Sequence, residues 1–166
     1  MVAKKKSTGD YQNILCASDF SDASDAAFAH ALAIAKTYKA TLYLVHVVDT
    51  SLDAGGFYLP HLSLDKYEKD MKKAAGEKIR KYFLRRLKGF TNFEIDVRSG
   101  VPHKEILKAV KKSKADLVVM GTYGRSGLDR LVFGSTTERV LRSVKLPVLV
   151  AHDMRGGTRK KTTRIV

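Results

Sequence analysis

Short apolar runs alternate along this chain with longer segments of helical periodicity. Runs of apolar, often branched residues predict five β-strands, at 14–17, 42–48, 93–97, 117–120 and 147–150. Between the strands, apolar residues recur every three or four positions, which predicts four helices that begin near Ser21, Ser63, Pro102 and Ser135. Strands that alternate with helices indicate an α/β fold, in which a five-stranded parallel sheet carries helices on both faces.

Two of the predicted strands have the pattern of sheet edges. The segment 93–97 alternates apolar and polar residues, which predicts a strand with one wet face. The last strand is apolar throughout, and in the strand order 3-2-1-4-5 it would form the opposite edge. An exposed apolar edge invites pairing with another chain. We therefore expect a homodimer joined along residues 148–150.

The length and composition fit one domain. With 166 residues, 44% of them hydrophobic, the chain can bury a single core. We place this domain at 10–152, between a basic N-terminal tail at 1–9 and a basic C-terminal tail at 153–166. A single cysteine excludes an internal disulfide, and no apolar run has the length of a secretory signal or of a membrane-spanning helix. The expectation is a cytoplasmic protein with no membrane contact.

The formal net charge of +14 raises the question of a nucleic-acid partner. Most of the excess lies in the two tails and in the segment 65–88, where Lys and Arg are interleaved with apolar residues at helical spacing. Such a segment is typical of a solvated helix face, and basic termini commonly serve solubility. The distribution disfavours nucleic acid as the partner, while leaving it open.

The stretch GTYGRSGLDRLVFGST, residues 121–136, directly follows the fourth predicted strand. In open α/β sheets, ligands bind beyond the carboxyl ends of the strands, where the strand order reverses. In the order 3-2-1-4-5 this crevice lies between the first and fourth strands. Ser18 and Asp19, which follow the first strand, would there meet Gly121 and Gly124.

The residues of this stretch have chemistry that suits a nucleotide. Gly121 and Gly124 would let backbone N–H groups approach an anion without interference from a side chain. Gly134 and Ser135 would stand at a helix N-terminus, which favours phosphate. Arg125 would add positive charge near the same anion.

Each of these features also has a purely structural explanation. The glycines could shape a turn, and the sequence from Ser135 to Glu138 has the form of a capping box. Asp19 could accept from an adenine amino group or a ribose hydroxyl, or it could only assist the helix that Ser21 caps. Their meeting at one crevice favours the nucleotide over these explanations. The stretch is neither a Walker loop nor the dinucleotide-binding fingerprint.

The spacing Gly121-x2-Gly124-x9-Gly134-Ser135 resembles the nucleotide-binding signature of the universal stress protein family. The segments ILCASDFSDASDAAFAHALAIAK and LVHVVD resemble the family's opening strand and helix and its second strand, and the likeness covers 14–152. The resemblance implies an adenine-nucleotide α-hydrolase-like, Rossmann-like fold, and members with this signature bind ATP. By position it implies that the adenosine contacts Ala17, Ser18, Asp19, Val47, Met120 and Gly121, and the phosphates contact Gly124, Arg125, Gly134, Ser135 and Thr136. AMP would share the adenosine contacts, and Mg²⁺ would join bound phosphates.

The expected function is that of a universal stress protein that binds ATP or AMP in a regulatory or protective role. No side chain in the motif is an obvious general base for water, so no catalytic residue is assigned, and slow ATP hydrolysis or self-phosphorylation stays open. The alternative is a binding module that works without nucleotide and uses its dimer surface, basic helix or tails on a protein or nucleic acid.

Other reactive side chains have simpler explanations. Cys16 lies in an apolar strand, which predicts a buried and inert thiol. His46 lies within the second predicted strand, which predicts a packed core histidine. The five histidines are isolated in the sequence, and none forms a cluster with zinc spacing, so no metal site is predicted.

Overall fold

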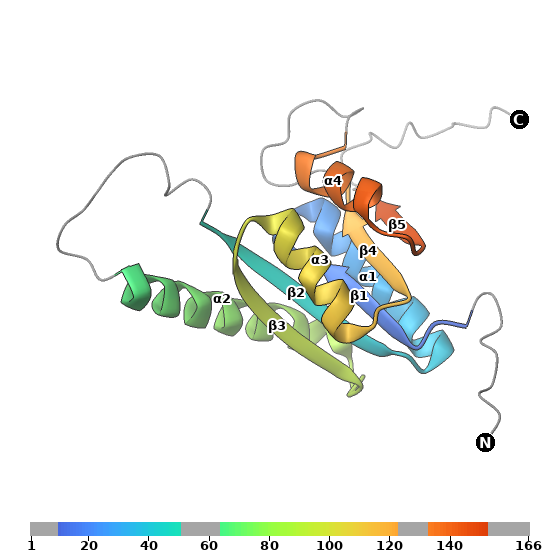
Figure 1. Ribbon diagram of the computed structural model, residues 1–166. Helices are drawn as coiled ribbons and strands as arrows, with labels where there is room; N and C mark the ends of the chain where they lie inside the picture. The colour runs from blue at the N-terminus through green and yellow to red at the C-terminus, as the bar shows by residue number, and fades with distance from the viewer. Residues whose placement is uncertain (1–9, 51–63, 123–132, 153–166) are drawn as a thin grey trace, which may run out of the picture.

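The computed structural model describes residues 10–50, 64–122 and 133–152. In these residues, parallel strands form one sheet in the order β3-β2-β1-β4-β5 (Figure 1). The strands are β1 (Asn13–Ala17), β2 (Thr41–Asp49), β3 (Phe93–Gly100), β4 (Leu117–Gly121) and β5 (Val148–Ala151). The five predicted strands and their order are confirmed.

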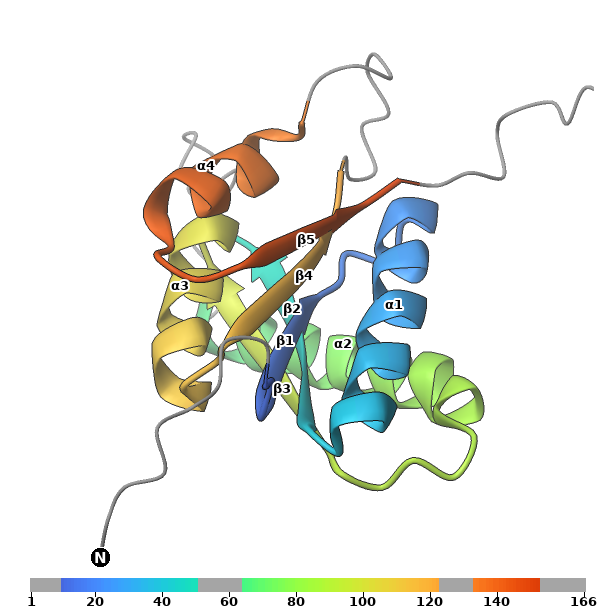
Figure 2. The ribbon, with the colours of Figure 1, turned by 90° about the vertical axis from the view of Figure 1, so that its right-hand side faces the viewer.

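Helices cover both faces of the sheet. They are α1 (Asp22–Tyr38), α2 (Leu64–Leu87), α3 (Pro102–Ser113) and α4 (Ser135–Ser143). Figure 2 shows α1 and α2 on one face and α3 and α4 on the other. Parallel strands require such crossover connections, because each strand must return to the same end of the sheet before the next begins. The predicted α/β fold with helices on both faces is confirmed.

The strand side chains alternate between two cores. Ile14, Leu15 and Cys16 of the central strand β1 are all fully buried. Ile14 and Cys16 belong to the core under α1 and α2, which includes Phe83 of α2, whereas Leu15 belongs to the core under α3 and α4. A strand covered on both faces cannot expose a polar side, which explains the continuous apolar runs in the sequence.

The two edge strands are those that the sequence pattern indicated. β3 forms one edge and pairs with β2 along its full length, so it extends three residues beyond the predicted segment 93–97. β5 forms the other edge beside β4.

None of the described helices is long and apolar enough to cross a bilayer. The two predicted tails lie outside the described residues.

The start of α1 follows the sequence closely. Ser21 is the N-cap, and its side chain accepts a hydrogen bond from the N–H of Ser24 at 3.2 Å. Asp22 and Asp25 lie in the first turn, where a carboxylate is favoured by the positive end of the helix dipole. The helix therefore begins directly after the loop that contains Ser18 and Asp19.

Candidate functional site

The strand order reverses between β1 and β4, and the two strands end side by side. Cys16 of β1 is paired with Val119 of β4. Two residues further along the chain from this pair, Ser18 follows the end of β1 and Gly121 is the last residue of β4, so both lie at the same edge of the sheet. The structure thus brings together the two segments whose meeting the sequence analysis expected.

Ser18 is buried and is fixed through both its main chain and its side chain. Its N–H donates to the carbonyl of Val45 (2.9 Å), and its carbonyl accepts from Nδ1 of His46 (2.7 Å). Its hydroxyl accepts from the N–H of Phe20 (3.3 Å) and lies 3.3 Å from the hydroxyl of Ser24. The loop after β1 is therefore held both by β2 and by α1.

Asp19 combines a structural contact with an available oxygen. Its Oδ1 accepts a hydrogen bond from the N–H of Ser21 (3.0 Å), which forms an Asx turn that leads into α1. Within the described part of the chain, its Oδ2 makes no hydrogen bond or ion pair. The structural explanation for Asp19 is thus correct, and a second carboxylate oxygen is still available to a donor on a ligand.

Phe20 connects this loop to α2. Its backbone is left-handed, with φ of 64°, a conformation that bulky residues rarely adopt. Its ring centroid lies 4.7 Å from that of His46 and 6.0 Å from that of Tyr82. The Phe83 ring lies at 6.5 Å, and Nζ of Lys78 lies 4.6 Å from the Phe20 centroid. This packing stabilises a backbone conformation that would otherwise cost free energy.

The first turn of α1 is also held by α2. Asp25 is buried there, accepts a hydrogen bond from the Tyr82 hydroxyl (2.7 Å) and pairs with the guanidinium of Arg86 (2.8 Å). The same guanidinium lies 4.3 Å from the centroid of the Tyr82 ring. The hydrogen bond to Asp25 and burial raise the pKa of Tyr82 above its usual value, so the phenol keeps the proton that this contact needs.

Gly121 allows the first turn of α1 to approach the end of β4. A Cβ at this position would lie 2.8 Å from the carbonyl carbon of Ala23 and 2.9 Å from the nitrogen of Ser24. Both are main-chain atoms of a helix, so neither can move aside as a flexible side chain would. Gly121 therefore has a packing role, whereas the sequence suggested only a turn or the approach of backbone N–H groups to an anion.

The N-terminus of α4 is tied to the end of β4 by two hydrogen bonds. The N–H of Gly134 donates to the carbonyl of Thr122 (2.7 Å), and Oγ1 of Thr137 donates to the carbonyl of Gly121 (2.9 Å). The N–H of Thr122 in turn donates to the carbonyl of Ala151 at the end of β5 (3.0 Å). Gly121 is thus contacted by the first turns of both α1 and α4, and Thr122 is bonded to the N-cap residue of α4.

The helix start at Ser135 agrees with the sequence, but the predicted capping box does not form. Gly134 occupies the N-cap position, and no side chain of the described residues caps the helix. Ser135 is the first helical residue, so its hydroxyl lies one position too far along the chain to serve as the N-cap acceptor. The side chain of Ser135 is exposed and that of Thr136 is half-buried. Within the described ranges, the first-turn N–H groups of α4 therefore have no capping side chain.

The hydroxyl of Thr122 is buried and has no hydrogen-bond partner among the described residues, with Thr122 only 1% exposed. Native structures rarely leave such a group unsatisfied, since it loses its contacts with water without replacement. The remaining predicted phosphate contacts, Gly124 and Arg125, lie in the following segment and outside the described residues.

The remaining predicted adenosine contacts lie at the ends of strands. Ala17 and Met120 are buried at the ends of β1 and β4. Val47 lies two residues beyond Val45, the β2 partner of Ala17. Val47 is therefore beside the loop that follows β1 and not beside β1 itself, which agrees with a position at the crevice.

The interpretation of Cys16 is confirmed, whereas that of His46 is right only in part. Cys16 is fully buried, and burial, together with the nearby charge of Asp25, raises the pKa of its thiol to about 12. His46 is half-buried and its ring links Ser18 to Phe20. No group of three His, Cys, Asp or Glu side chains that could hold a metal ion occurs in the described ranges.

Comparisons with known proteins agree with one another. The model of the universal stress protein family matches residues 10–152. Universal stress protein MJ0531 of Methanocaldococcus jannaschii is 36% identical over 141 residues, which cover 84% of this chain and 81% of the relative. Universal stress protein MJ0577 of the same organism is 30% identical over 154 residues, which cover 84% of this chain and 94% of the relative.

Solved structures have the same fold. The universal stress protein UspA from Lactobacillus plantarum matches with a TM-score of 0.71 at 29% identity, covering 87% of this chain and 99% of its own. The structure of MJ0577 matches with a TM-score of 0.70 at 26% identity, covering 86% and 96%. A universal stress protein solved in complex with cAMP matches with a TM-score of 0.58 at 24% identity, covering 87% and 99%, which shows likeness of fold alone.

Proposed function

The chain belongs to the universal stress protein family, and on that premise we propose that it binds an adenine nucleotide, ATP or AMP, at the carboxyl ends of β1 and β4. Binding serves a regulatory or protective role in the stress response. The observation that carries this proposal is the convergence of the N-terminal turns of α1 and α4 on Gly121 at the end of β4. Helix N-termini attract phosphate through their free N–H groups and the positive end of the helix dipole.

The loop after β1 supplies the adenosine contacts in this proposal. Oδ2 of Asp19 accepts from the adenine amino group or a ribose hydroxyl, while Oδ1 keeps its bond to Ser21. Ala17 and Val47 contact the base from the ends of their strands. The hydrogen bonds that fix Ser18 support this assignment, because a loop ordered before binding loses little conformational entropy when the ligand arrives.

The start of α4 supplies the phosphate contacts. Gly134, Ser135 and Thr136 hold the phosphates there, and the lack of a capping side chain leaves the first-turn N–H groups available. The hydroxyl of Thr122, which has no partner in the described part of the chain, supports a site that a ligand or a bound water completes, because leaving it unsatisfied costs about 1–3 kcal/mol. The described residues offer no metal cluster, so Mg²⁺ would arrive on the phosphates of ATP and neutralise their charge.

The direct test is calorimetric titration of the protein, freed of bound nucleotide, with ATP and Mg²⁺ and with AMP. Cyclic AMP is a useful comparison ligand, because a universal stress protein of the same fold was solved with it. Micromolar or tighter binding of ATP or AMP is the expected result. Absence of binding by the folded wild-type protein would overturn the proposal.

Two variants that each remove one negative charge test whether Asp19 contacts the nucleotide directly or affects its affinity only through charge. Asp19→Asn keeps an oxygen that can accept from the N–H of Ser21, but replaces Oδ2 with a donor. We expect affinity to fall about tenfold or more, since a hydrogen bond to a charged group contributes about 1.5–3 kcal/mol. Asp22→Asn, at an exposed position in the first turn of α1, is the control and should bind as wild type. Equal losses in both variants would contradict the assignment of Asp19.

We also propose that β5 is the edge through which two copies pair. The hydrogen bonds of β4 to the carbonyls of Pro147 and Ala151 show that odd-numbered residues of β5 face β4, so the main-chain groups of Val148 and Val150 face outward. Val150→Pro removes an outward N–H without removing a bond to β4. Sedimentation at micromolar concentration should show a wild-type dimer and a monomeric variant of unchanged circular dichroism. A wild-type monomer would rule this edge out.

A further inference from the structure

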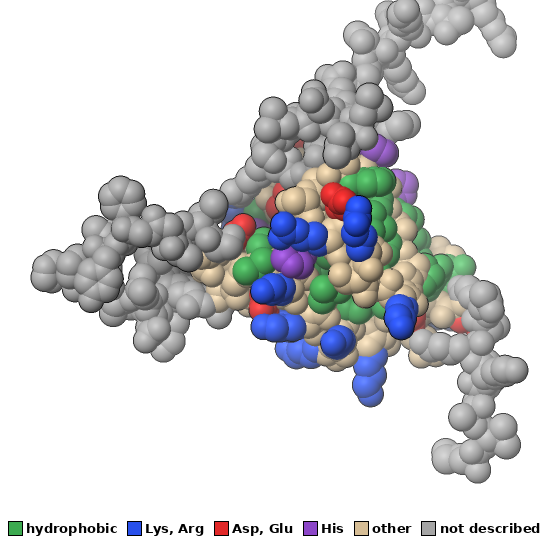
Figure 3. All heavy atoms as spheres, turned by 45° about the horizontal axis from the view of Figure 1, so that its top comes forward, with side chains coloured by type: hydrophobic (Ala, Val, Ile, Leu, Met, Phe, Trp, Pro, Cys, Tyr) green, Lys and Arg blue, Asp and Glu red, His purple; other side chains and the backbone are tan. Residues whose placement is uncertain are grey.

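The outer surface of α3 and α4 carries a concentration of exposed positive side chains. We call it the α3/α4 basic face, and it comprises Lys104, Lys108, Lys111, Lys112, Lys114, Arg139, Arg142 and Lys145, all exposed. The two helices themselves contribute only two acidic residues, Glu105 and Glu138. Figure 3 looks onto this part of the molecule and shows many Lys and Arg side chains with few acidic ones among them.

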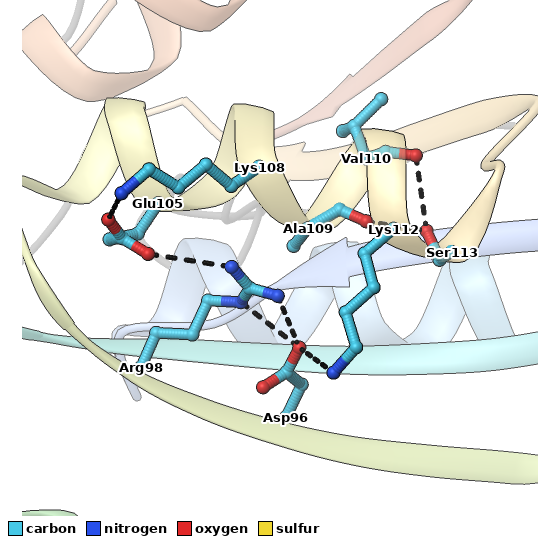
Figure 4. A network of polar contacts seen from close by, with 8 residues as sticks. All are labelled: Asp96, Arg98, Glu105, Lys108, Ala109, Val110, Lys112 and Ser113. Atoms are coloured by element: carbon cyan, nitrogen blue, oxygen red, sulfur yellow. Dashed lines mark hydrogen bonds and ion pairs between the residues drawn. The ribbon is translucent and has the colours of Figure 1, made fainter.

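The acidic residues near α3 lie beneath the lysines and not on the outer surface. Arg98, only 13% exposed, bridges Asp96 (2.8 Å) and Glu105 (3.4 Å) (Figure 4). Lys108 and Lys112 extend outward from the same two acids, with their side chains 67% and 73% exposed, whereas those of Glu105 and Asp96 are 14% and 27% exposed. Three cations thus share two acids, and the network presents its positive members to solvent.

Five other cations of this face have no ion-pair partner within the described residues: Lys104, Lys111, Lys114, Arg139 and Lys145. The charges of α3 and α4 also act on a shared neighbour. His103 of α3 is half-buried, and burial together with the charges of Arg139 and Lys104 lowers its pKa. Cations from the two helices therefore lie close to one imidazole, so the positive surface continues from α3 to α4.

The same face lacks the apolar anchors of other interaction surfaces. The exposed large hydrophobic residues in the described part of the chain are Tyr38, Leu84 and Phe133, and none lies within α3 or α4. Protein interfaces concentrate their binding energy in buried aromatic and apolar side chains. Surfaces for single-stranded nucleic acid use aromatic rings on which bases stack. Regularly spaced phosphates of a duplex require only cations.

We propose that the α3/α4 basic face binds the phosphate backbone of double-stranded nucleic acid, without preference for sequence. Lys104, Lys108 and Lys111 follow one another at intervals of four and three residues, which places them along one side of α3. They and Arg139 of α4 replace the counterions of several phosphates, and release of those counterions supplies the binding free energy. This activity goes beyond nucleotide binding and uses none of the residues assigned to the nucleotide.

The test measures binding of the full chain to a fluorescent 20-base-pair duplex at several salt concentrations, without added nucleotide. The first variant, Lys104→Gln/Lys111→Gln/Arg139→Gln, removes three unpaired cations from the α3/α4 basic face. The matched control, Arg80→Gln/Lys81→Gln/Arg85→Gln, removes three exposed cations from α2 on the opposite face of the sheet. Both variants lose three positive charges and so have equal net charge, which means that only the position of the lost charges differs.

We expect the wild type to bind the duplex, with an affinity that falls steeply as salt rises. The triple variant of the α3/α4 basic face should make the negative slope of log K against log salt shallower by about 3, roughly one for each lost phosphate contact. The α2 control should change the slope little. A duplex RNA of the same sequence that binds equally would support recognition of the backbone.

Other results would overturn the proposal. Equal loss in both triple variants would mean that total charge and not this face determines binding. Tighter binding of the matching single strand would point to base contacts elsewhere. Competition by poly-glutamate as effective as by DNA, charge for charge, would identify an acidic protein as the partner. No binding at about 50 mM salt, where phosphate contacts are strongest, would exclude the activity altogether.

Discussion

The two sides of the proposed nucleotide site are built in different ways. On the β1 side, Ser18 and Asp19 are fixed by hydrogen bonds to β2 and α1, and Phe20 is packed against α2. On the β4 side, α4 begins at an uncapped glycine and is tied to the strand by the contacts of Gly134 and Thr137. The first side is fixed by contacts with three neighbouring elements, while the start of α4 is tied to the end of β4 by two hydrogen bonds.

From this difference we infer that the β1 side selects the nucleoside and that the β4 side binds phosphates without strict geometric demands. A rigid loop can distinguish a base or a ribose, because its acceptors do not move to suit another ligand. An uncapped helix N-terminus offers several equivalent N–H groups, and any of them can bond a phosphate oxygen. We therefore expect damage to the β1 side to change which nucleoside binds, and damage to the β4 side to change how strongly phosphates add to affinity.

The largest effect is expected where the two sides touch. Gly121→Ala places a Cβ within 2.9 Å of main-chain atoms of Ala23 and Ser24, so α1 and β4 must separate. Overpacking of this kind costs about 2–3 kcal/mol of unfolding free energy. Urea denaturation measures it, with Gly76→Ala as the control. That Cβ would meet Val97 at 3.8 Å, an ordinary contact, and replacing a helical glycine should add about 0.5–1 kcal/mol. Equal stability of both variants would refute this packing role.

Phe20 tests whether the β1 side depends on its contacts with α2. Phe20→Ala removes the ring from the cluster with His46 and Tyr82 but keeps a Cβ at φ of 64°. We expect a loss of about 2 kcal/mol for a partly buried ring, together with weaker nucleotide binding. Phe20→Gly loses the same ring but fits the left-handed backbone, so it should equal or exceed the alanine variant in stability. A markedly less stable glycine variant would show that the backbone there is not strained.

The fold could be predicted from the sequence because its signals are local. Strands buried on both faces must be continuously apolar, and Ser21 caps α1 with the side chain that the sequence shows. The roles of Phe20 and Gly121 could not be predicted in this way. The left-handed backbone of Phe20 and the close approach of α1 to Gly121 both depend on residues that are distant in the chain. The capping box failed for a related reason, since contact with Thr122 makes Gly134 the N-cap.

The distribution of charge over the surface also could not be predicted from the sequence. Counted along the chain, Lys and Arg gather in the tails and in α2, and the acidic residues Asp96 and Glu105 offset only part of the positive charge of α3. In the structure Arg98 lies beneath α3 and pairs with both Asp96 and Glu105, while Lys108 and Lys112 contact the same two acids from the outside. A count of charges cannot separate an inner layer from an outer one.

Thr137 tests the weaker attachment of the β4 side, with an intermediate effect. Thr137→Val keeps the size and shape of the side chain but removes the bond to the carbonyl of Gly121. We expect a loss of about 1–2 kcal/mol in stability, because the partly buried carbonyl loses this partner. Titrations should show ATP affinity falling more than adenosine affinity, since only phosphates depend on the position of α4. Thr137→Ser keeps the hydroxyl and should restore ATP binding. Equal losses for ATP and adenosine would contradict the division between the two sides.

Glu105 should have the smallest effect and provides a reference outside both sides of the site. The hydrogen bond from Lys108, aided by Arg98, holds the pKa of Glu105 below its usual value of 4.5. A carboxyl whose pKa is lower in the folded state adds stability above its unfolded pKa and loses it as pH falls through the folded one. Wild-type stability should therefore decline below about pH 4.5, and Glu105→Gln should flatten this decline while costing about 1 kcal/mol at pH 7. Glu138→Gln, which breaks only an exposed pair with Arg142, should cost less than about 0.5 kcal/mol. Glu105→Gln should not alter ATP affinity, and a change would show that the site extends along α3 beyond these two sides.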